Sequence, residues 1–274
     1  MRPHRLIGVV NVTPDSFSDG GEFLDPGRAI DQARALVRHG ADIVDLGGES
    51  TRPGAGAVSA AEELARVGPV LDGLTEVGVP ISIDTSKVRV AAAAIDSGAE
   101  IVNDVSAMQA EPELAGLCAE RGVRVVLMHM KGTPRTMQVN PTYDDVVDEV
   151  RAFLTERIGF ATSEGIEEER IWVDPGIGFG KTVDHNLELI RRLDELRELG
   201  RPIVIGTSRK SFIGKITGRE AGERVGGTIA ASVLSHANGA DLLRVHDVLE
   251  VGEAVHVAAM VSGPSDWRGQ PAAT

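Results

Sequence analysis

Short apolar runs alternate with longer amphipathic segments along most of the chain. The short runs are rich in β-branched residues and apolar at nearly every position, which is typical of parallel strands covered on their outer faces. The longer segments repeat apolar residues at helical spacing. Predicted strands cover residues 6–10, 43–46, 80–83, 100–103, 124–128, 171–173, 202–206 and 241–245. Predicted helices include residues 27–39, 60–74, 86–97, 143–163, 184–199, 222–237 and 247–261.

Several of the predicted helices are followed by a glycine, the residue that most readily ends a helix in the left-handed conformation. These glycines are Gly40, Gly78, Gly98, Gly122, Gly165, Gly200 and Gly239. Eight strand–helix units without an evident linker predict an α/β fold, a single (β/α)8 TIM barrel over residues 1–262. The alternative is an open doubly wound sheet, which usually has fewer units at this length. Residues 263–274 are rich in Gly, Pro and Ala and are predicted to be disordered.

The formal net charge of −13 argues against non-specific binding to nucleic acid or to an anionic membrane. Cys118 is the single cysteine, so no intramolecular disulfide can form. The apolar run at residues 6–10 is shorter than the roughly 7–15 residues of a secretory signal. No stretch approaches the roughly 20 apolar residues of a membrane span. We therefore expect a cytoplasmic location.

Polar and charged residues cluster directly after the predicted strands. They are residues 11–19, 49–52, Asp84, Asn103, Asp104, His129, Asp174, residues 208–210 and residues 244–246. Because the carboxyl ends of barrel strands meet at one mouth, these groups should converge there. For Asp84 the alternative is a helix N-cap, since Thr85 and Ser86 follow it.

Four of these clusters favour binding of a phosphorylated substrate. The loop over residues 11–21 is rich in acids, amides and turn formers, which suits an oxygen-ligated Mg²⁺ held jointly with a substrate phosphate. The basic residues within 208–211 and 244–246, together with Arg52, could hold a carboxylate or a diphosphate. The alternative for these cations is a set of unrelated surface charges.

The segment Gly176–Thr182 resembles a phosphate-binding P-loop, which requires a glycine, four residues and then Gly-Lys-Ser/Thr. Pro175 occupies the position of the required first glycine. The segment is better interpreted as an acid at a strand end, Asp174, followed by a turn.

Eight strings of residues occur in order between residue 6 and about residue 260. They are NVTPDSFSDGG (11–21), GGESTRPGA (47–55), SIDT (82–85), ND (103–104), LMHMKGTPRTMQ (127–138), DPGIGFGK (174–181), TSRKSFIG (207–214) and RVHDV (244–248). Together they resemble the dihydropteroate synthase family over nearly the whole chain. Residues 105–109 are less typical of that family, and we expect them to be peripheral to its function.

The resemblance implies a role for each matching residue. The pterin would be bound by Asp84, Asn103, Asp174 and Lys210, and the diphosphate by Asn11, Arg244 and His246, with Asn11 also binding Mg²⁺. The para-aminobenzoate pocket would be formed by Thr51, Arg52, Pro53 and Ser211. Asp84, Asp19 and Lys210 would be catalytic. The first two loops would close over the substrate.

The implied reaction condenses 6-hydroxymethyl-7,8-dihydropterin diphosphate with para-aminobenzoate in folate biosynthesis. The aniline nitrogen is a weak nucleophile and the neutralised diphosphate leaves well, so we favour departure of diphosphate before attack by the amine. Sulfonamides, which mimic para-aminobenzoate, are expected to compete with it, and a homodimer is expected from the family. The alternatives are a pterin-dependent methyltransferase and a paralogue that binds pterin without turnover.

Overall fold

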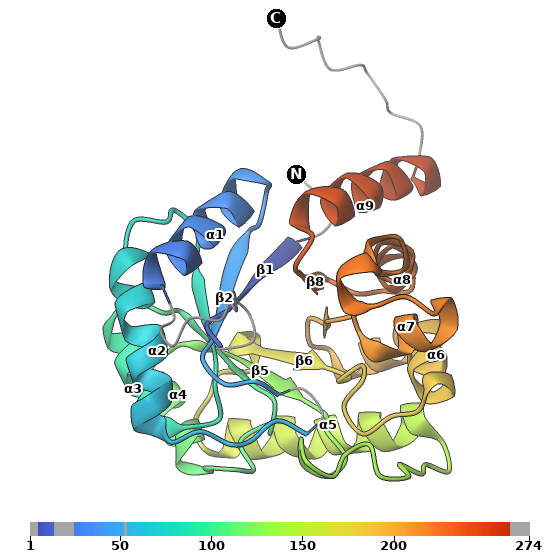
Figure 1. Ribbon diagram of the computed structural model, residues 1–274. Coiled ribbons are helices and arrows are strands. Elements are labelled where there is room, and N and C mark those ends of the chain that lie inside the picture. Colours follow the sequence, from blue (N-terminus) through green and yellow to red (C-terminus); the bar gives the residue numbers. More distant parts are fainter. Residues whose placement is uncertain (1–4, 14–24, 52–53, 264–274) are drawn as a thin grey trace, which may run out of the picture.

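The eight predicted strands all form, and they lie parallel in one sheet (Figure 1). The computed structural model describes residues 5–13, 25–51 and 54–263. The strands are β1 (Arg5–Asn11), β2 (Ile43–Gly47), β3 (Ile81–Asp84), β4 (Ile101–Asp104), β5 (Arg124–Met128), β6 (Ile171–Asp174), β7 (Val204–Ile205) and β8 (Leu242–Val245). Their order across the sheet is β6-β5-β4-β3-β2-β1-β8-β7.

The two outer strands of this order meet and close the sheet into a barrel. Val173 of β6 forms a parallel bridge with Ile203, just before β7. The Val173 backbone N–H donates to the Pro202 carbonyl over 3.0 Å. The predicted (β/α)8 barrel is thereby confirmed, and the open doubly wound sheet is excluded.

Helices follow the strands and surround the barrel (Figure 1). They are α1 (Pro26–Arg38), α2 (Ala60–Gly73), α3 (Val88–Asp96), α4 (Glu113–Arg121), α5 (Val146–Ser163), α6 (Val183–Arg191), α7 (Ser211–Thr217), α8 (Val225–Ala237) and α9 (Val248–Ser262). Two predictions need correction. The segment 184–199 is not one helix, because α6 ends at Arg191 and Leu193–Leu199 continues as a 3-10 helix. Helix α7 falls on residues for which no helix was predicted.

Side chains that satisfy free backbone N–H groups start several of these helices. The Asp145 carboxylate accepts hydrogen bonds from the backbone N–H groups of Val147 and Asp148 at the start of α5. At the start of α2, the Ser59 hydroxyl accepts from the backbone N–H of Glu62. Such caps stabilise a helix by about 0.5–2 kcal/mol. They fix where each helix begins, and with it the loop from the preceding strand.

The barrel interior changes from apolar to polar along its axis. Inward-facing residues near the amino ends of the strands form a cluster of Ile7, Ile43, Ile101, Val126, Trp172, Val204 and Leu242. The guanidinium groups of Arg5 and Arg124 lie 5.0 and 5.4 Å from the Trp172 ring. A packed apolar floor at this end leaves the carboxyl ends of the strands as the place for polar side chains.

In the described ranges, no helix combines the length and apolar character needed to cross a membrane. The cytoplasmic location stays a prediction. So does disorder over residues 263–274, nearly all of which lie outside the described residues.

Candidate active site

The strands deliver the predicted pterin-binding residues to one mouth of the barrel. Asp84 and Asp174 are the last residues of β3 and β6, and Asn103 lies one residue before the end of β4. Asp84 is the register partner of Asn103 on the neighbouring strand. Lys210 directly precedes α7. Its ammonium interacts electrostatically with the carboxylates of Asp174 and Asp84.

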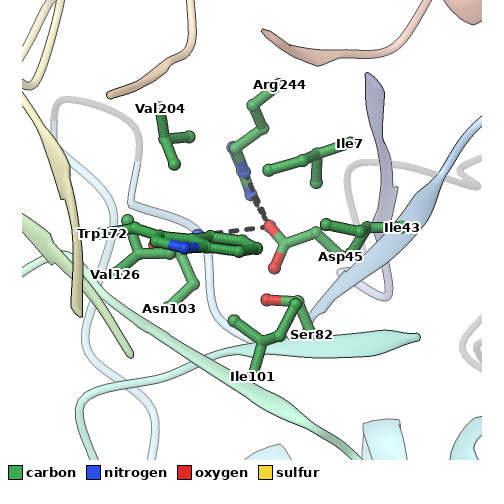
Figure 2. Close-up of a pocket in the computed structure, with 10 residues that line it drawn as sticks. All are labelled: Ile7, Ile43, Asp45, Ser82, Ile101, Asn103, Val126, Trp172, Val204 and Arg244. Atoms are coloured by element: carbon green, nitrogen blue, oxygen red, sulfur yellow. Dashed lines mark hydrogen bonds and ion pairs between the residues drawn. The ribbon is translucent and has the colours of Figure 1, made fainter. Parts of the chain in front are cut away.

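An ion-pair network crosses the barrel beneath this mouth (Figure 2). The Arg244 Nε donates to the Asp45 carboxylate over 2.6 Å, and its Nη2 lies 2.6 Å from the same oxygen. Nη2 also lies 2.7 Å from the Asp84 carboxylate. The Asn103 amide nitrogen donates to Asp45 over 3.3 Å. Arg244, proposed from the resemblance as a diphosphate ligand, is therefore bound to two carboxylates in this structure.

Asp45, which pairs with Arg244 and Asn103 beneath the mouth, is a residue that the sequence pattern did not single out. It lies inside β2, within the strand predicted over residues 43–46. The signal that could have identified it is a charged residue in an otherwise apolar run, because buried acids are rare unless paired.

Burial shifts the pKa of the Asp84 carboxyl upward, to about 7, by disfavouring its charged form. The positive charge of Arg244 opposes this shift, while the negative charges of Asp45, Glu63 and Asp104 add to it. Asp84 is therefore poised to gain or lose a proton near neutral pH.

Asp174 and Lys210 interact electrostatically at the same barrel mouth. Burial raises the pKa of the Asp174 carboxyl, although the Gly176 backbone N–H donates to it over 2.6 Å. Burial lowers the pKa of the Lys210 ammonium to about 8, against the attraction of Asp174. The Lys210 ammonium lies 4.1 Å from the centre of the Phe179 ring, a cation–π contact.

The turn after Asp174 requires a glycine at position 176. Gly176 has a φ of 69°, and a Cβ there would lie 1.9 Å from the His129 carbonyl oxygen. Glycine alone allows this close approach between the loops that follow β5 and β6.

Asn11, Ser208 and His246 form a second polar cluster at the mouth. The Ser208 hydroxyl lies 3.0 Å from His246 Nδ1, and the Asn11 amide nitrogen lies 3.4 Å from His246 Nε2. Burial, together with the positive charge of Arg244, lowers the pKa of the His246 imidazole to about 3. His246 is consequently neutral and offers hydrogen bonds rather than charge, which corrects its inclusion among the cations.

The other basic residues of the sequence clusters separate in the structure. Arg209 is exposed and pairs with Asp247. Ser211, the first residue of α7, is exposed. Thr51 is half-buried, whereas Asp19, Arg52 and Pro53 lie outside the described residues.

Two alternative interpretations of single residues are wrong. Asp84 does not cap a helix, because α3 begins at Val88 and its N-cap residue is Lys87, with no side-chain cap. Lys181 of the P-loop-like segment is buried, and its ammonium contacts His129 Nδ1 over 2.8 Å and the Phe179 carbonyl over 3.0 Å. This lysine therefore ties two loops together instead of facing a phosphate.

The described residues contain no group of three or more His, Cys, Asp or Glu side chains placed to hold a metal ion. Asn11 supplies one neutral oxygen, because its amide nitrogen is directed to His246. A single amide oxygen is a weak Mg²⁺ site by itself, but it fits an ion whose other ligands are diphosphate oxygens and water.

Comparison with known proteins agrees with this geometry. Residues 7–246 match the family described as pterin binding enzyme. The chain is 47% identical over 255 residues to dihydropteroate synthase of Synechocystis, covering 92% of this chain and 88% of that protein.

Solved structures are similar over a comparable span. Dihydropteroate synthase of Xanthomonas albilineans with 4-aminobenzoic acid is 47% identical, with a TM-score of 0.89 and coverage of 95% of this chain and 94% of that one. The Yersinia pestis enzyme in a sulfonamide drug complex is 40% identical, with a TM-score of 0.90 and coverage of 94% of each chain. The chain therefore belongs to the pterin binding enzyme family and, within it, to the dihydropteroate synthase family.

Proposed function

We propose that this chain joins 6-hydroxymethyl-7,8-dihydropterin diphosphate to para-aminobenzoate, releasing diphosphate and 7,8-dihydropteroate. The observation that carries the proposal is the meeting of Asp84, Asn103, Asp174 and Lys210 at one barrel mouth in a chain with these relatives. The purified protein should form 7,8-dihydropteroate from the two substrates, measured by chromatography with mass detection. Absence of this product at saturating substrates would refute the proposal.

The hydrogen-bonding groups at the mouth are complementary to a pterin. A pterin edge presents paired N–H donors, which carboxylates such as Asp84 and Asp174 accept well. Lys210 is a donor that can reach the ring carbonyl and N5 side. Carboxylate acceptors and an ammonium donor at one mouth restrict how a flat polar ring can be oriented.

The charges at the mouth favour departure of diphosphate before attack by the amine. Two carboxylates, Asp45 and Asp84, face one cation, Arg244. When fully ionised, this set carries one excess negative charge, which stabilises positive charge developing on the pterin methylene and ring. The amine then attacks the cationic carbon, so no covalent bond to the protein is needed. The resemblance also assigns Asp19 to this step.

Mg²⁺, when bound by Asn11 and the diphosphate, would neutralise the leaving group. We expect Mg²⁺ to bind tightly only when the diphosphate substrate is present, since Asn11 alone supplies one neutral oxygen. Calorimetric titration of Mg²⁺ into the protein with and without substrate checks this. Tight binding to the bare protein, unchanged by substrate, would contradict the assignment.

We further propose that para-aminobenzoate binds after the pterin diphosphate, in a pocket that Thr51, Arg52, Pro53 and Ser211 complete. Sulfonamides should then bind measurably only when diphosphate is present, because a ligand shifts a conformational equilibrium only through differential affinity. Sulfonamide affinity is measured by calorimetry with the empty protein and with pterin plus diphosphate. Equal affinities would refute ordered binding.

The proposed homodimer would use the outer surface of helices α7, α8 and α9, of which α8 packs against both α7 and α9 (Figure 1). Its exposed large apolar residues are Ile216, Val225, Leu234, Leu249, Val257, Met260 and Val261. Apolar patches of this kind mark protein–protein contacts. A symmetric pair would bury the surface on both copies.

A double substitution, Leu234→Glu with Val257→Glu, should convert a dimer into a monomer, because it places charges in the contact. Light scattering during gel filtration measures the mass. The matched control is Val139→Glu, which changes a 77% exposed residue outside this surface and should leave the dimer intact. A wild-type protein that is monomeric at micromolar concentration would contradict the proposal.

A further inference from the structure

The Asp45 carboxylate is enclosed in the middle of the barrel and is fully buried. It lies in a small internal cavity, with Ser82 of β3 below it and the Trp172 ring to its left in the view of Figure 2. One carboxylate oxygen accepts from Arg244 and from Asn103. Among the described residues, the other oxygen is buried and has no hydrogen-bond partner. Asp45 is not among the predicted substrate contacts.

The contact with Asp45 sets the orientation of the Asn103 amide. An ionised carboxylate only accepts hydrogen bonds, so the amide must turn its nitrogen toward Asp45, as it does over 3.3 Å. The Asn103 oxygen is then left for a ligand. With Asp84 in register beside it, the pocket presents a row of acceptors to that edge of the ring.

Asp45 also sets the position of Arg244. Two N–H groups of the guanidinium are directed to one Asp45 oxygen, and one of these nitrogens also contacts Asp84. Arg244 is thus held between two carboxylates, those of Asp45 and Asp84. Without Asp45, the guanidinium would be free to pair with Asp84 alone and neutralise the charge that the reaction needs.

We propose that Asp45 is a positioning residue of the proposed synthase: it turns the Asn103 oxygen toward the pterin and keeps Arg244 shared between two carboxylates. The pocket consequently selects a ring edge that offers N–H donors. This inference rests on the proposed function and adds to it Asp45, which acts through Asn103 and Arg244.

The test is Asp45→Asn, which keeps the side-chain shape and removes the charge. The affinity for 6-hydroxymethylpterin, measured by calorimetry without catalysis, should fall on the order of tenfold, because the Asn103 amide is no longer forced into one orientation. Ser82→Ala is the matched control, since it alters a neutral residue in the same cavity and should leave affinity within about twofold. Unchanged affinity in Asp45→Asn would overturn the proposal.

A second readout separates positioning from simple loss of structure. Asp84 is faced by Arg244 of β8, Asp45 of β2, Glu63 of α2, Asp104 of β4 and Lys210 before α7. Removing the charge of Asp45 should lower the pKa of Asp84, so the acidic limb of kcat/KM for the pterin diphosphate should move to lower pH. The limb should stay in place in Ser82→Ala. A limb that does not move in Asp45→Asn would also overturn the proposal.

Failure of the inference can be told from failure of the proposed function. A wild-type protein that neither binds the pterin nor makes product refutes the function. A wild-type protein that does both, with an Asp45→Asn variant that behaves identically, refutes only the role of Asp45.

If Asp45→Asn does not fold, Asn103→Asp provides the test. It keeps the shape but sets a second acceptor 3.3 Å from Asp45, where a donor lies now. Pterin affinity should then fall more than tenfold, since one carboxyl must take up a proton or turn away. Retained affinity would overturn the proposal.

Discussion

Replacing Asp84 by asparagine is expected to lower kcat by on the order of 10²–10³-fold, the typical cost of losing one preorganised electrostatic group. The carboxylate lies at the mouth, and among the described residues only Arg244 forms an ion pair with it, so its charge is available as the pterin becomes cationic. The protein should stay folded, because burial of that charge is itself costly and asparagine has nearly the same shape.

Asp174→Asn is the matched comparison. Asp174 is expected to bind the neutral pterin equally in ground and transition states, so its loss should mainly raise KM for the pterin diphosphate. Rapid-quench measurement of a single turnover isolates the chemical step in both variants, and thermal melting reports their stability. A folded Asp84→Asn protein with a near-normal single-turnover rate would refute the cationic mechanism.

The second large effect is on pH dependence. We expect kcat/KM for the pterin diphosphate to rise with pH until Asp84 is ionised, near pH 7, and to fall as Lys210 loses its proton, near pH 8. Because kcat/KM reports ionisation in the free enzyme, each limb should change about tenfold per pH unit outside this window. The acidic limb rises because Asp84 must be charged to accept hydrogen bonds from the pterin and to stabilise its cation. The basic limb falls because Lys210 must be charged to donate hydrogen bonds to the ring.

Steady-state assays from pH 5 to 10 in buffers of constant ionic strength measure the two limbs. The Asp84→Asn variant serves as the control and should lose the acidic limb while keeping the basic one. A wild-type profile that is flat between pH 5 and 7 would show that Asp84 is ionised throughout, against its buried position beside Asp45.

The repeating elements could be predicted because hydrophobic periodicity is a local signal. All eight predicted strands overlap the observed ones. Strands β3 and β6 reach one residue further than predicted, since Asp84 and Asp174 still pair in the ladder although they are polar. Strand β7 is shorter than predicted, partly because Pro202 lacks an N–H to donate.

Helix α7 could not be predicted from its own sequence. It has seven residues, and the Lys210 side chain at its N-cap makes no capping hydrogen bond, so neither length nor capping indicates a helix. Their resemblance to a family motif at residues 207–214 indicates binding but carries no information on secondary structure.

Long-range pairs explain what else the sequence could not predict about the site. The resemblance identified Asp84 and Arg244, but their contact joins β3 to β8 across the barrel. The contacts of Asp45 are long-range too, because its partners Asn103 and Arg244 lie far from it along the chain. The roles of Asp19, Arg52 and Pro53 stay predictions, since these residues lie outside the described ones.

Release of diphosphate, measured with and without para-aminobenzoate, tests the central claim most directly. A synthase should release diphosphate from 6-hydroxymethyl-7,8-dihydropterin diphosphate continuously when para-aminobenzoate is present, with one dihydropteroate formed for each diphosphate. Without it, release should be confined to a slow or single-turnover amount, because the pterin cation has no acceptor other than water. The account would be contradicted if the purified, folded protein bound the pterin but released no diphosphate with para-aminobenzoate present.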